Sequence, residues 1–223
     1  DKASRAVVEN KVSRWVARGF IFVSVNYRLL PNADPLQQAE DVARALATAQ
    51  AQAVSWGGNS SKFILMGHSA GAHLVALLGA APSKAIGVGV RPWLGAILLD
   101  SAALDVVQIM EAKHARFYNG AFGNQPAYWR SASPFHVLTA SASPLLAVCS
   151  TRRKDSCSEA RNFTAQATSL GAHAKVLEQN LSHREINENL GLPGAYTQAV
   201  EEFMGSLDAA VMETLTTPST GTH

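Results

Sequence analysis

One short stretch of the chain has the residue types and spacing of an activated nucleophile. Gly67, Ser69 and Gly71 form the pattern G-x-S-x-G between an apolar run at 63–66 and a small-residue run at 72–78. The first run predicts a strand and the second a helix, which is the setting of a nucleophile elbow. In so tight a turn, we expect both glycines to avoid collisions with strand and helix while Ser69 is held exposed. The pattern predicts a nucleophilic serine.

A serine hydroxyl reacts only when a base takes its proton, and the base needs an acid to orient it. Because G-x-S-x-G also occurs in ordinary Gly-rich turns, these partners decide the interpretation. In α/β-hydrolases the acid and then the histidine follow the serine, each after a later strand. Asp155 lies in the loop after the apolar run at 144–149, and we predict it as the acid. His183 directly follows the run at 175–179, and we predict it as the base.

Other residues near these positions have alternative roles. Asp100 ends a predicted strand, where some hydrolases keep the acid, and it is the alternative to Asp155; its simpler role is to cap the next loop. His68 and His73 flank the serine, but a neighbour within the elbow is expected to point away from the base side. We therefore predict packing or pocket-lining roles for both, with His68 as a substrate-binding residue. The Ala70 amide, at the start of the helix, is the predicted oxyanion donor.

The elements that must position these residues are predicted from apolar periodicity. Strand and helix patterns alternate along the chain, which predicts an α/β class with a mostly parallel, doubly wound sheet and helices on both faces. Strands are expected at 20–25, 63–66, 94–99, 144–149 and 175–179, and helices at 4–18, 35–55, 72–78, 106–115, 158–170 and 194–207. Residues 81–92 are expected to form a loop, and residues 117–136 an irregular aromatic segment.

Composition limits the possible classes of protein. The chain has 223 residues, of which 47% are hydrophobic and 16% charged, with a net charge of +2. This fits one globular domain, expected to span residues 1–213, with a cap insertion around 104–136 and a flexible tail at 214–223. The charges are interspersed without a basic stripe, so we expect no nucleic-acid partner. No apolar run approaches the roughly 18–20 residues of a transmembrane helix, so no such segment is expected.

The chain resembles the carboxylesterase/hormone-sensitive-lipase and feruloyl-esterase-like group of bacterial α/β-hydrolases. The resemblance rests on the elbow and its ordered partners, supported by Tyr27-Arg28-Leu29, Glu40-Asp41-Val42, Trp56-Gly57-Gly58-Asn59, Ser133-Pro134 and His183-Arg184-Glu185-Ile186-Asn187. It implies a serine carboxylic-ester hydrolase acting on a small-molecule ester, with no cofactor or metal, as a monomer or homodimer. An arylformamidase or amide hydrolase with the same triad, and a non-catalytic binding protein on the same fold, are the alternatives.

The resemblance also implies a segment that this sequence does not contain. Members of the group carry a His-Gly-Gly oxyanion motif shortly before a Gly-Asp-Lys-like stretch, and this chain opens at Asp1-Lys2. We therefore expect the first strands of the fold, and the second oxyanion donor with them, to lie upstream of the sequence given.

Two further groups of residues near the predicted site each have two interpretations. Cys149 and Cys157 bracket the predicted acid, and a disulfide between them would pin its loop and favour a periplasmic or secreted location. Two reduced thiols, compatible with the cytoplasm, are the alternative; we favour the disulfide. Phe117, Tyr118 and Trp129 lie where hydrolases insert a cap. They are predicted to line the substrate pocket, or else to pack together.

Overall fold

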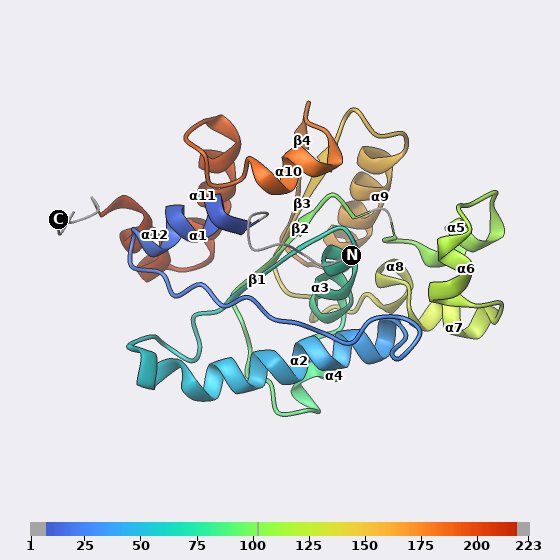
Figure 1. Ribbon diagram of the computed structural model, residues 1–223, viewed down its shortest axis with the longest axis horizontal. Coiled ribbons are helices and arrows are strands. Elements are labelled where there is room, and N and C mark those ends of the chain that lie inside the picture. The colour runs from blue at the N-terminus through green and yellow to red at the C-terminus, as the bar shows by residue number, and fades with distance from the viewer. Residues whose placement is uncertain (1–7, 102, 218–223) are drawn as a thin grey trace.

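Four parallel strands form the sheet at the centre of the molecule (Figure 1). The computed structural model describes residues 8–101 and 103–217. The strands lie side by side in chain order: β1 (Ile64–His68), β2 (Gly95–Leu99), β3 (Leu145–Ser150) and β4 (Ala174–Gln179). Because all four run the same way, their carboxyl ends meet at one edge of the sheet. The predicted nucleophile and base, and both candidate acids, all follow these ends.

Both faces of the sheet are covered, which makes the central strands continuously apolar. In β2, Ala96 and Leu98 pack into one hydrophobic cluster, and Ile97 and Leu99 pack into another on the opposite face. The residues of β3 alternate between the two clusters in the same way. Every residue of β2 and β3 is buried.

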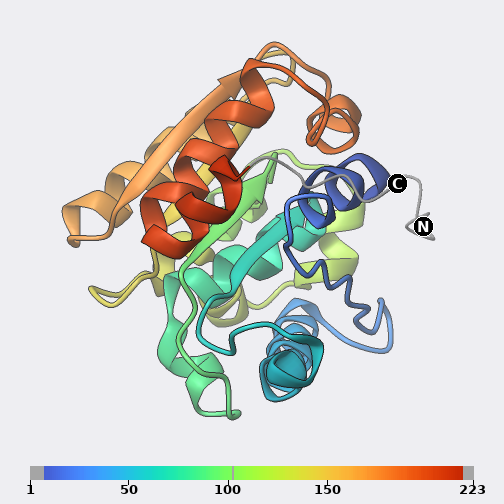
Figure 2. The same ribbon diagram turned by 90° about the vertical axis from the view of Figure 1, so that its left-hand side faces the viewer.

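Helices cover the two faces, as the doubly wound prediction requires (Figure 2). On one side lie α2 (Pro35–Gln52), α3 (Ala70–Ala80) and α9 (Ser156–Ser169). On the other lie α1 (Glu9–Val16), α10 (His183–Glu188), α11 (Ala195–Leu207) and α12 (Ala209–Thr216). Short helical pieces complete the fold: η2 (Ala53–Trp56), α4 (Pro82–Ile86), α5 (Val106–Glu111), α6 (Phe117–Phe122), α7 (Pro126–Ser131) and α8 (Pro134–Val137).

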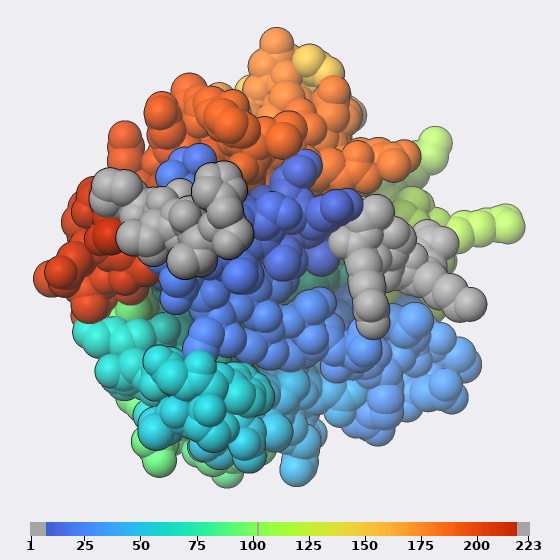
Figure 3. Space-filling model, turned by 60° about the vertical axis from the view of Figure 1, so that its left-hand side comes forward, coloured from blue at the N-terminus to red at the C-terminus, as the bar shows by residue number. Residues whose placement is uncertain are grey.

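The predicted buried strand at 20–25 is not part of the sheet. The segment has no regular secondary structure. Its phenylalanines Phe20 and Phe22 pack toward the core, but Ile21, Val23 and Val25 are 46%, 41% and 39% exposed. No described strand pairs with it, so its strand-like alternation buries one face only. Figure 3 shows residues 17–30 on the surface between α11–α12 and the α2–η2 region. Side chains of this segment and of β1 line a cavity of about 530 Å³.

Several other expectations about elements were wrong. Residues 117–136 are not irregular but form α6, α7 and most of α8, and α4 lies within the predicted loop at 81–92. Of the tail predicted at 214–223, residues 214–216 belong to α12, and residues 218–223 lie outside the described residues. The start of the helix predicted at 4–18 also falls partly outside them. None of the helices that the structure describes is both long and apolar enough to cross a membrane.

Candidate active site

Ser69 lies at the strained turn between β1 and α3. Its backbone has φ 55° and ψ −118°, a conformation that costs free energy and is found mostly where function requires it. A Cβ atom at Gly67 would lie 2.2 Å from the backbone oxygen of Gly71, so this position excludes any side chain. The prediction that Gly71 also avoids a collision was wrong, because a Cβ there would meet nothing within 4 Å. The turn therefore depends on one of its glycines.

His183 is fixed by the beginning of α10. Ser182 caps this helix: its hydroxyl accepts from the amide of Glu185, and the Glu185 carboxylate accepts from the Ser182 amide at 2.7 Å. His183 is consequently the first residue of the helix, which begins after a short connection from β4. Its ring is directed at an aspartate, with Nδ1 2.6 Å from Oδ2 of Asp100.

Asp100, the alternative acid, is the residue that the structure pairs with His183. Its side chain is 0% exposed and accepts four hydrogen bonds. The donors to Oδ1 are Ser150 N at 2.9 Å and Ser156 Oγ at 2.5 Å, and those to Oδ2 are Arg153 Nη1 and His183 Nδ1, both at 2.6 Å. Burial alone would raise the pKa of the Asp100 carboxyl, but these donors outweigh it and hold the pKa well below its usual value. A buried, ionised carboxylate therefore faces the imidazole.

The structure does not bring Asp155 to His183. Asp155 is exposed and occupies the N-cap position of α9, in the left-handed region at φ 65°. Its side chain makes no capping bond; its backbone oxygen accepts from Ser158 Oγ and Glu159 N. The geometry thus places Asp100 rather than Asp155 beside His183, and Asp155 lies where the loop after β3 begins a helix.

His68 contacts the base, contrary to the expectation that it would point away. Its ring centroid lies 4.3 Å from that of His183, and its Nε2–H donates to the backbone oxygen of His183 at 2.9 Å. Burial, followed by the nearby His183, lowers the pKa of His68 to about 4, so the ring is neutral at neutral pH. His73 has the expected packing role: it is buried, with Nδ1 2.7 Å from the oxygen of Ala103.

Two contacts connect Ser69 to this histidine–aspartate pair. The Ser69 amide donates to Leu99 O at 3.0 Å, directly before Asp100, and the preceding residue is His68, which stacks on His183. Among the residues that the structure describes, the Ser69 hydroxyl has no hydrogen-bond partner. In ligand-free sites this bond often forms only with the substrate present. Ala70 is exposed and begins α3, so its N–H has no acceptor within the helix.

Sequence reasoning missed Arg153, which donates a hydrogen bond to Asp100. This arginine follows β3 within Arg152-Arg153-Lys154, and nothing in its type or position distinguishes it from its two basic neighbours. Ser150 and Ser156, which hold the other oxygen of Asp100, were also missed. In the described ranges 8–101 and 103–217, no group of three or more His, Cys, Asp or Glu side chains is arranged to hold a metal ion.

A disulfide joins Cys149, in β3, to Cys157, in the first turn of α9. Both residues are buried, and their Cα atoms are 5.1 Å apart. The bridge closes the loop that carries Arg153 and leads to Ser156, two of the donors to Asp100. It therefore restricts the loop that surrounds the acid.

The three aromatic residues predicted to line a pocket belong to the helices α6 and α7. Phe117 is 67% exposed, and its ring lies 4.1 Å from that of Tyr118. Trp129 donates from Nε1 to the backbone oxygen of Phe122 at 3.1 Å. The Tyr118 ring packs on those of Phe117 and Phe122, and burial, then the charge of Glu159, raises its pKa. A pocket-lining role for all three stays a prediction.

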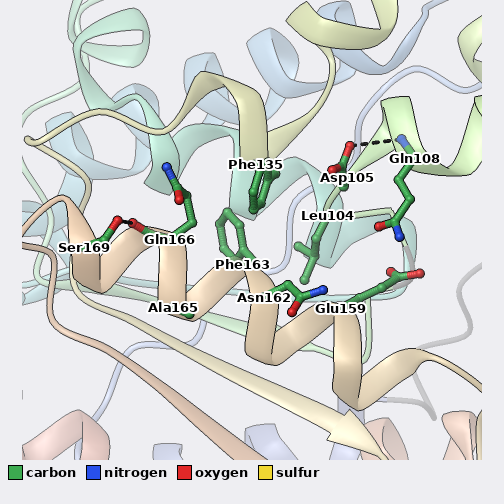
Figure 4. Close-up of a pocket in the computed structure, with 10 residues that line it drawn as sticks. All are labelled: Leu104, Asp105, Gln108, Phe135, Glu159, Asn162, Phe163, Ala165, Gln166 and Ser169. Atoms are coloured by element: carbon green, nitrogen blue, oxygen red, sulfur yellow. Dashed lines mark hydrogen bonds between the residues drawn. The ribbon is translucent and has the colours of Figure 1, made fainter.

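A hollow of about 350 Å³ lies between α9, α8 and the beginning of α5 (Figure 4). The rings of Phe135 and Phe163 occupy its middle, and the carboxylates of Asp105 and Glu159 lie at one end. Oε2 of Glu159 is buried without a hydrogen-bond partner among the described residues. Burial raises the pKa of Glu159 to about 7, with Arg153 opposing the shift. Glu159 therefore contrasts with Asp100: the Asp100 carboxylate is buried and accepts four hydrogen bonds, whereas the buried Oε2 of Glu159 accepts none from the described residues.

One protein family matches more than half of the chain. A family model described as BD-FAE matches residues 1–156. No curated protein matches the sequence significantly.

Solved esterases share the fold. Esterase 2 of Thermogutta terrifontis superposes with a TM-score of 0.71 at 19% identity, covering 90% of this chain and 75% of that one. Carboxyl esterase 2 of Tuber melanosporum gives 0.70 at 16% identity, with 92% and 72% coverage. A truncated carbohydrate esterase from gut microbiota gives 0.68 at 14%, with 92% and 77% coverage.

Proposed function

Because the chain belongs to the BD-FAE family, an esterase family of the α/β-hydrolase fold, we propose that it is a serine carboxylic-ester hydrolase that forms an acyl-enzyme on Ser69. The observation that carries the mechanism is the contact between His183 Nδ1 and Asp100 Oδ2, 2.6 Å long, beside a strained serine turn. The small-molecule ester is the substrate class, and the acyl and alcohol parts are left open.

In this mechanism each residue has one role. Asp100 accepts a hydrogen bond from Nδ1–H of His183 and so leaves Nε2 free to act as a base. His183 takes the proton from the Ser69 hydroxyl as its oxygen attacks the acyl carbon. The Ala70 N–H, at the positive end of α3, donates to the oxyanion that develops. His183 then returns the proton to the leaving alcohol, and water releases the acyl group by the same steps.

An amide or formamide hydrolase is the second candidate, because the same three residues can cleave either bond. A non-catalytic binding protein is the third; it is disfavoured because the chain retains a serine in the elbow, a histidine and a buried carboxylate. The aromatic residues Phe117, Tyr118 and Trp129 are retained as pocket candidates, with His68 assigned instead to support of the base.

The test is hydrolysis by the wild type and by Ser69→Ala. Substrates are p-nitrophenyl acetate, p-nitrophenyl octanoate and N-formylkynurenine, and a fluorophosphonate probe reports the reactive serine. We expect ester turnover and labelling in the wild type, and in Ser69→Ala a loss of about 10³-fold or more in kcat with no labelling. Ser55→Ala, at an exposed serine in η2, is the matched control and should keep both.

Each alternative has its own outcome. Preferential turnover of N-formylkynurenine would indicate a formamide hydrolase. A wild type that neither turns over substrate nor reacts with the probe would indicate a binding protein. A loss below about 10²-fold in Ser69→Ala would contradict the nucleophilic role.

A further inference from the structure

Arg153 contacts both members of the histidine–aspartate pair. Its Nη1 lies 2.6 Å from Oδ2 of Asp100, 3.1 Å from the backbone oxygen of Asp100 and 3.1 Å from Nδ1 of His183. The side chain is 30% exposed, whereas that of Asp100 is 0% exposed. One carboxylate oxygen, Oδ2, therefore accepts hydrogen bonds from both the guanidinium and the imidazole.

The position of the carboxylate does not depend on Arg153 alone. Oδ1 of Asp100 is held by the hydroxyl of Ser156 and the amide of Ser150. Removing the guanidinium thus leaves two donors on the other oxygen and the His183 contact on Oδ2. A variant without this cation should retain the pair, which makes its electrostatic effect measurable.

The charge of Arg153 opposes that of Asp100 at the imidazole. A guanidinium is always protonated in proteins, so it presents a positive charge 3.1 Å from Nδ1 of His183 at every relevant pH. A like charge disfavours the imidazolium form, whereas the carboxylate favours it. The ionised carboxylate also keeps the proton on Nδ1, because Nδ1–H donates to Oδ2. Arg153 therefore weakens proton binding without changing the tautomer needed for catalysis.

On the basis of the proposed function, we propose that Arg153 acts through the Asp100–His183 pair: its guanidinium shares Oδ2 with the imidazole and, as a fixed positive charge beside Nδ1, disfavours protonation of His183. Ester hydrolysis should then continue at pH values low enough that the His183 imidazole would already be protonated if the arginine were absent. Nothing in the arrangement requires Arg153 to contact the substrate.

Other charged and titratable groups around His183 come from every neighbouring element. They are His68 from β1, Lys11 from α1, Arg152 from the loop after β3, Asp155 and Glu159 near α9, Arg184, Glu185 and Glu188 from α10, and Tyr196 from α11. Of these, His68 contacts the ring of His183, and its pKa of about 4 leaves it neutral through the relevant range. Within the part of the chain that the structure describes, Arg153 is the cation that contacts both Asp100 and His183.

The experiment measures kcat/KM for p-nitrophenyl acetate against pH in the wild type, Arg153→Met, Arg153→Gln and Arg153→Lys. We expect the acid limb to move to higher pH by about 1 unit in both neutral variants and by a few tenths at most in the lysine variant. Arg152→Met is the matched control. It removes the same group one residue away, where the guanidinium contacts Asn180 and Glu185, and its acid limb should stay in place.

Two results would overturn the proposal. One is an acid limb that stays in place in a folded neutral variant; the other is an equal shift in the lysine and neutral variants. A second measurement, NMR titration of the His183 ring without substrate, needs no activity. It should show the same upward shift in Arg153→Gln, and absence of this shift would refute the coupling. Failure of the proposed function, by contrast, would appear as no hydrolysis and no probe labelling in the wild type.

Discussion

Two aspartates follow neighbouring strands and share a left-handed backbone, yet the structure pairs only one of them with a histidine. Asp100, after β2, has φ 53°, and Asp155, between β3 and α9, has φ 65°. The Asp100 carboxylate is fully buried and accepts four hydrogen bonds. Asp155 is exposed, and within the described part of the chain its side chain accepts none.

The difference shows that a position after a strand does not identify the acid of a triad. A carboxylate oriented toward an imidazole must be desolvated, and desolvation is tolerated only when donors compensate it. The loop after β3 supplies those donors to Asp100 through Arg153 and Ser156. The loop in which we predicted the acid therefore contributes the groups that stabilise the Asp100 carboxylate on the neighbouring strand.

The largest expected effect comes from Asp100→Asn. The amide keeps the shape of the carboxylate but loses its charge, so His183 is no longer held in the Nδ1–H tautomer. We expect kcat for p-nitrophenyl acetate to fall by about 10³–10⁴-fold. The measurement is steady-state kinetics, with circular dichroism to establish that the variant is folded.

The result separates the two aspartates because the same substitution is available at both. A fall in kcat below about tenfold in folded Asp100→Asn would show that the contact at 2.6 Å is structural and would reopen the choice of acid.

A third carboxyl sharpens the comparison, because Glu159 is largely buried but lacks donors to Oε2. Its folded-state pKa of about 7 lies above its usual value of 4.5, so the folded protein binds this proton more tightly than the unfolded chain does. Its contribution to stability is therefore present below pH 4.5 and is lost as the pH rises through 7. We expect Glu159→Gln to be more stable than the wild type at pH 8, by on the order of 2 kcal/mol, and nearly equal to it at pH 4.5.

Chemical denaturation at several pH values measures this difference. Glu111→Gln, at an exposed glutamate, is the control and should differ from the wild type by the same small amount at every pH. A difference between Glu159→Gln and the wild type that stays constant from pH 4.5 to 8 would contradict the assignment.

The parts of the fold that could be predicted are those in which local pattern and burial agree. The strands β2 and β3 are fully buried apolar runs, and β4 is a partly exposed strand at the end of the sheet; the predicted bounds of all three agree with the observed ones within one residue. Residues 20–25 have the same apolar, β-branched composition but pair with no described strand. A strand joins a sheet only beside a partner strand, and the composition of a segment shows its own strand propensity but not whether a partner is present. The short helices α6 and α7 were missed because aromatic and Gly-rich turns show little periodicity.

For the candidate site, the G-x-S-x-G motif and the order of the residues along the chain predicted where the serine and the histidine lie. Ser69 and His183 lie in the turns where strand-end reasoning puts them. The acid could not be predicted in this way, because Asp100 and Asp155 both follow strands, and the distinction depends on donors that are distant in sequence. Arg153 and Ser156 reach Asp100 across more than 50 residues of chain. The spacing of residues along a single sequence does not predict a contact between positions so far apart.

The smallest expected effect is that of Asp155→Asn, the same change at the other aspartate. Asparagine tolerates the left-handed conformation, and the exposed side chain has no hydrogen bond to lose, so kcat/KM should stay within about twofold and stability within about 0.5 kcal/mol. One consequence is still measurable. The Asp155 charge is one of the causes that raise the pKa of Glu159, so that pKa should fall slightly when the charge is removed. A loss of kcat above about 10²-fold would instead make Asp155 the acid and Asp100 its structural neighbour.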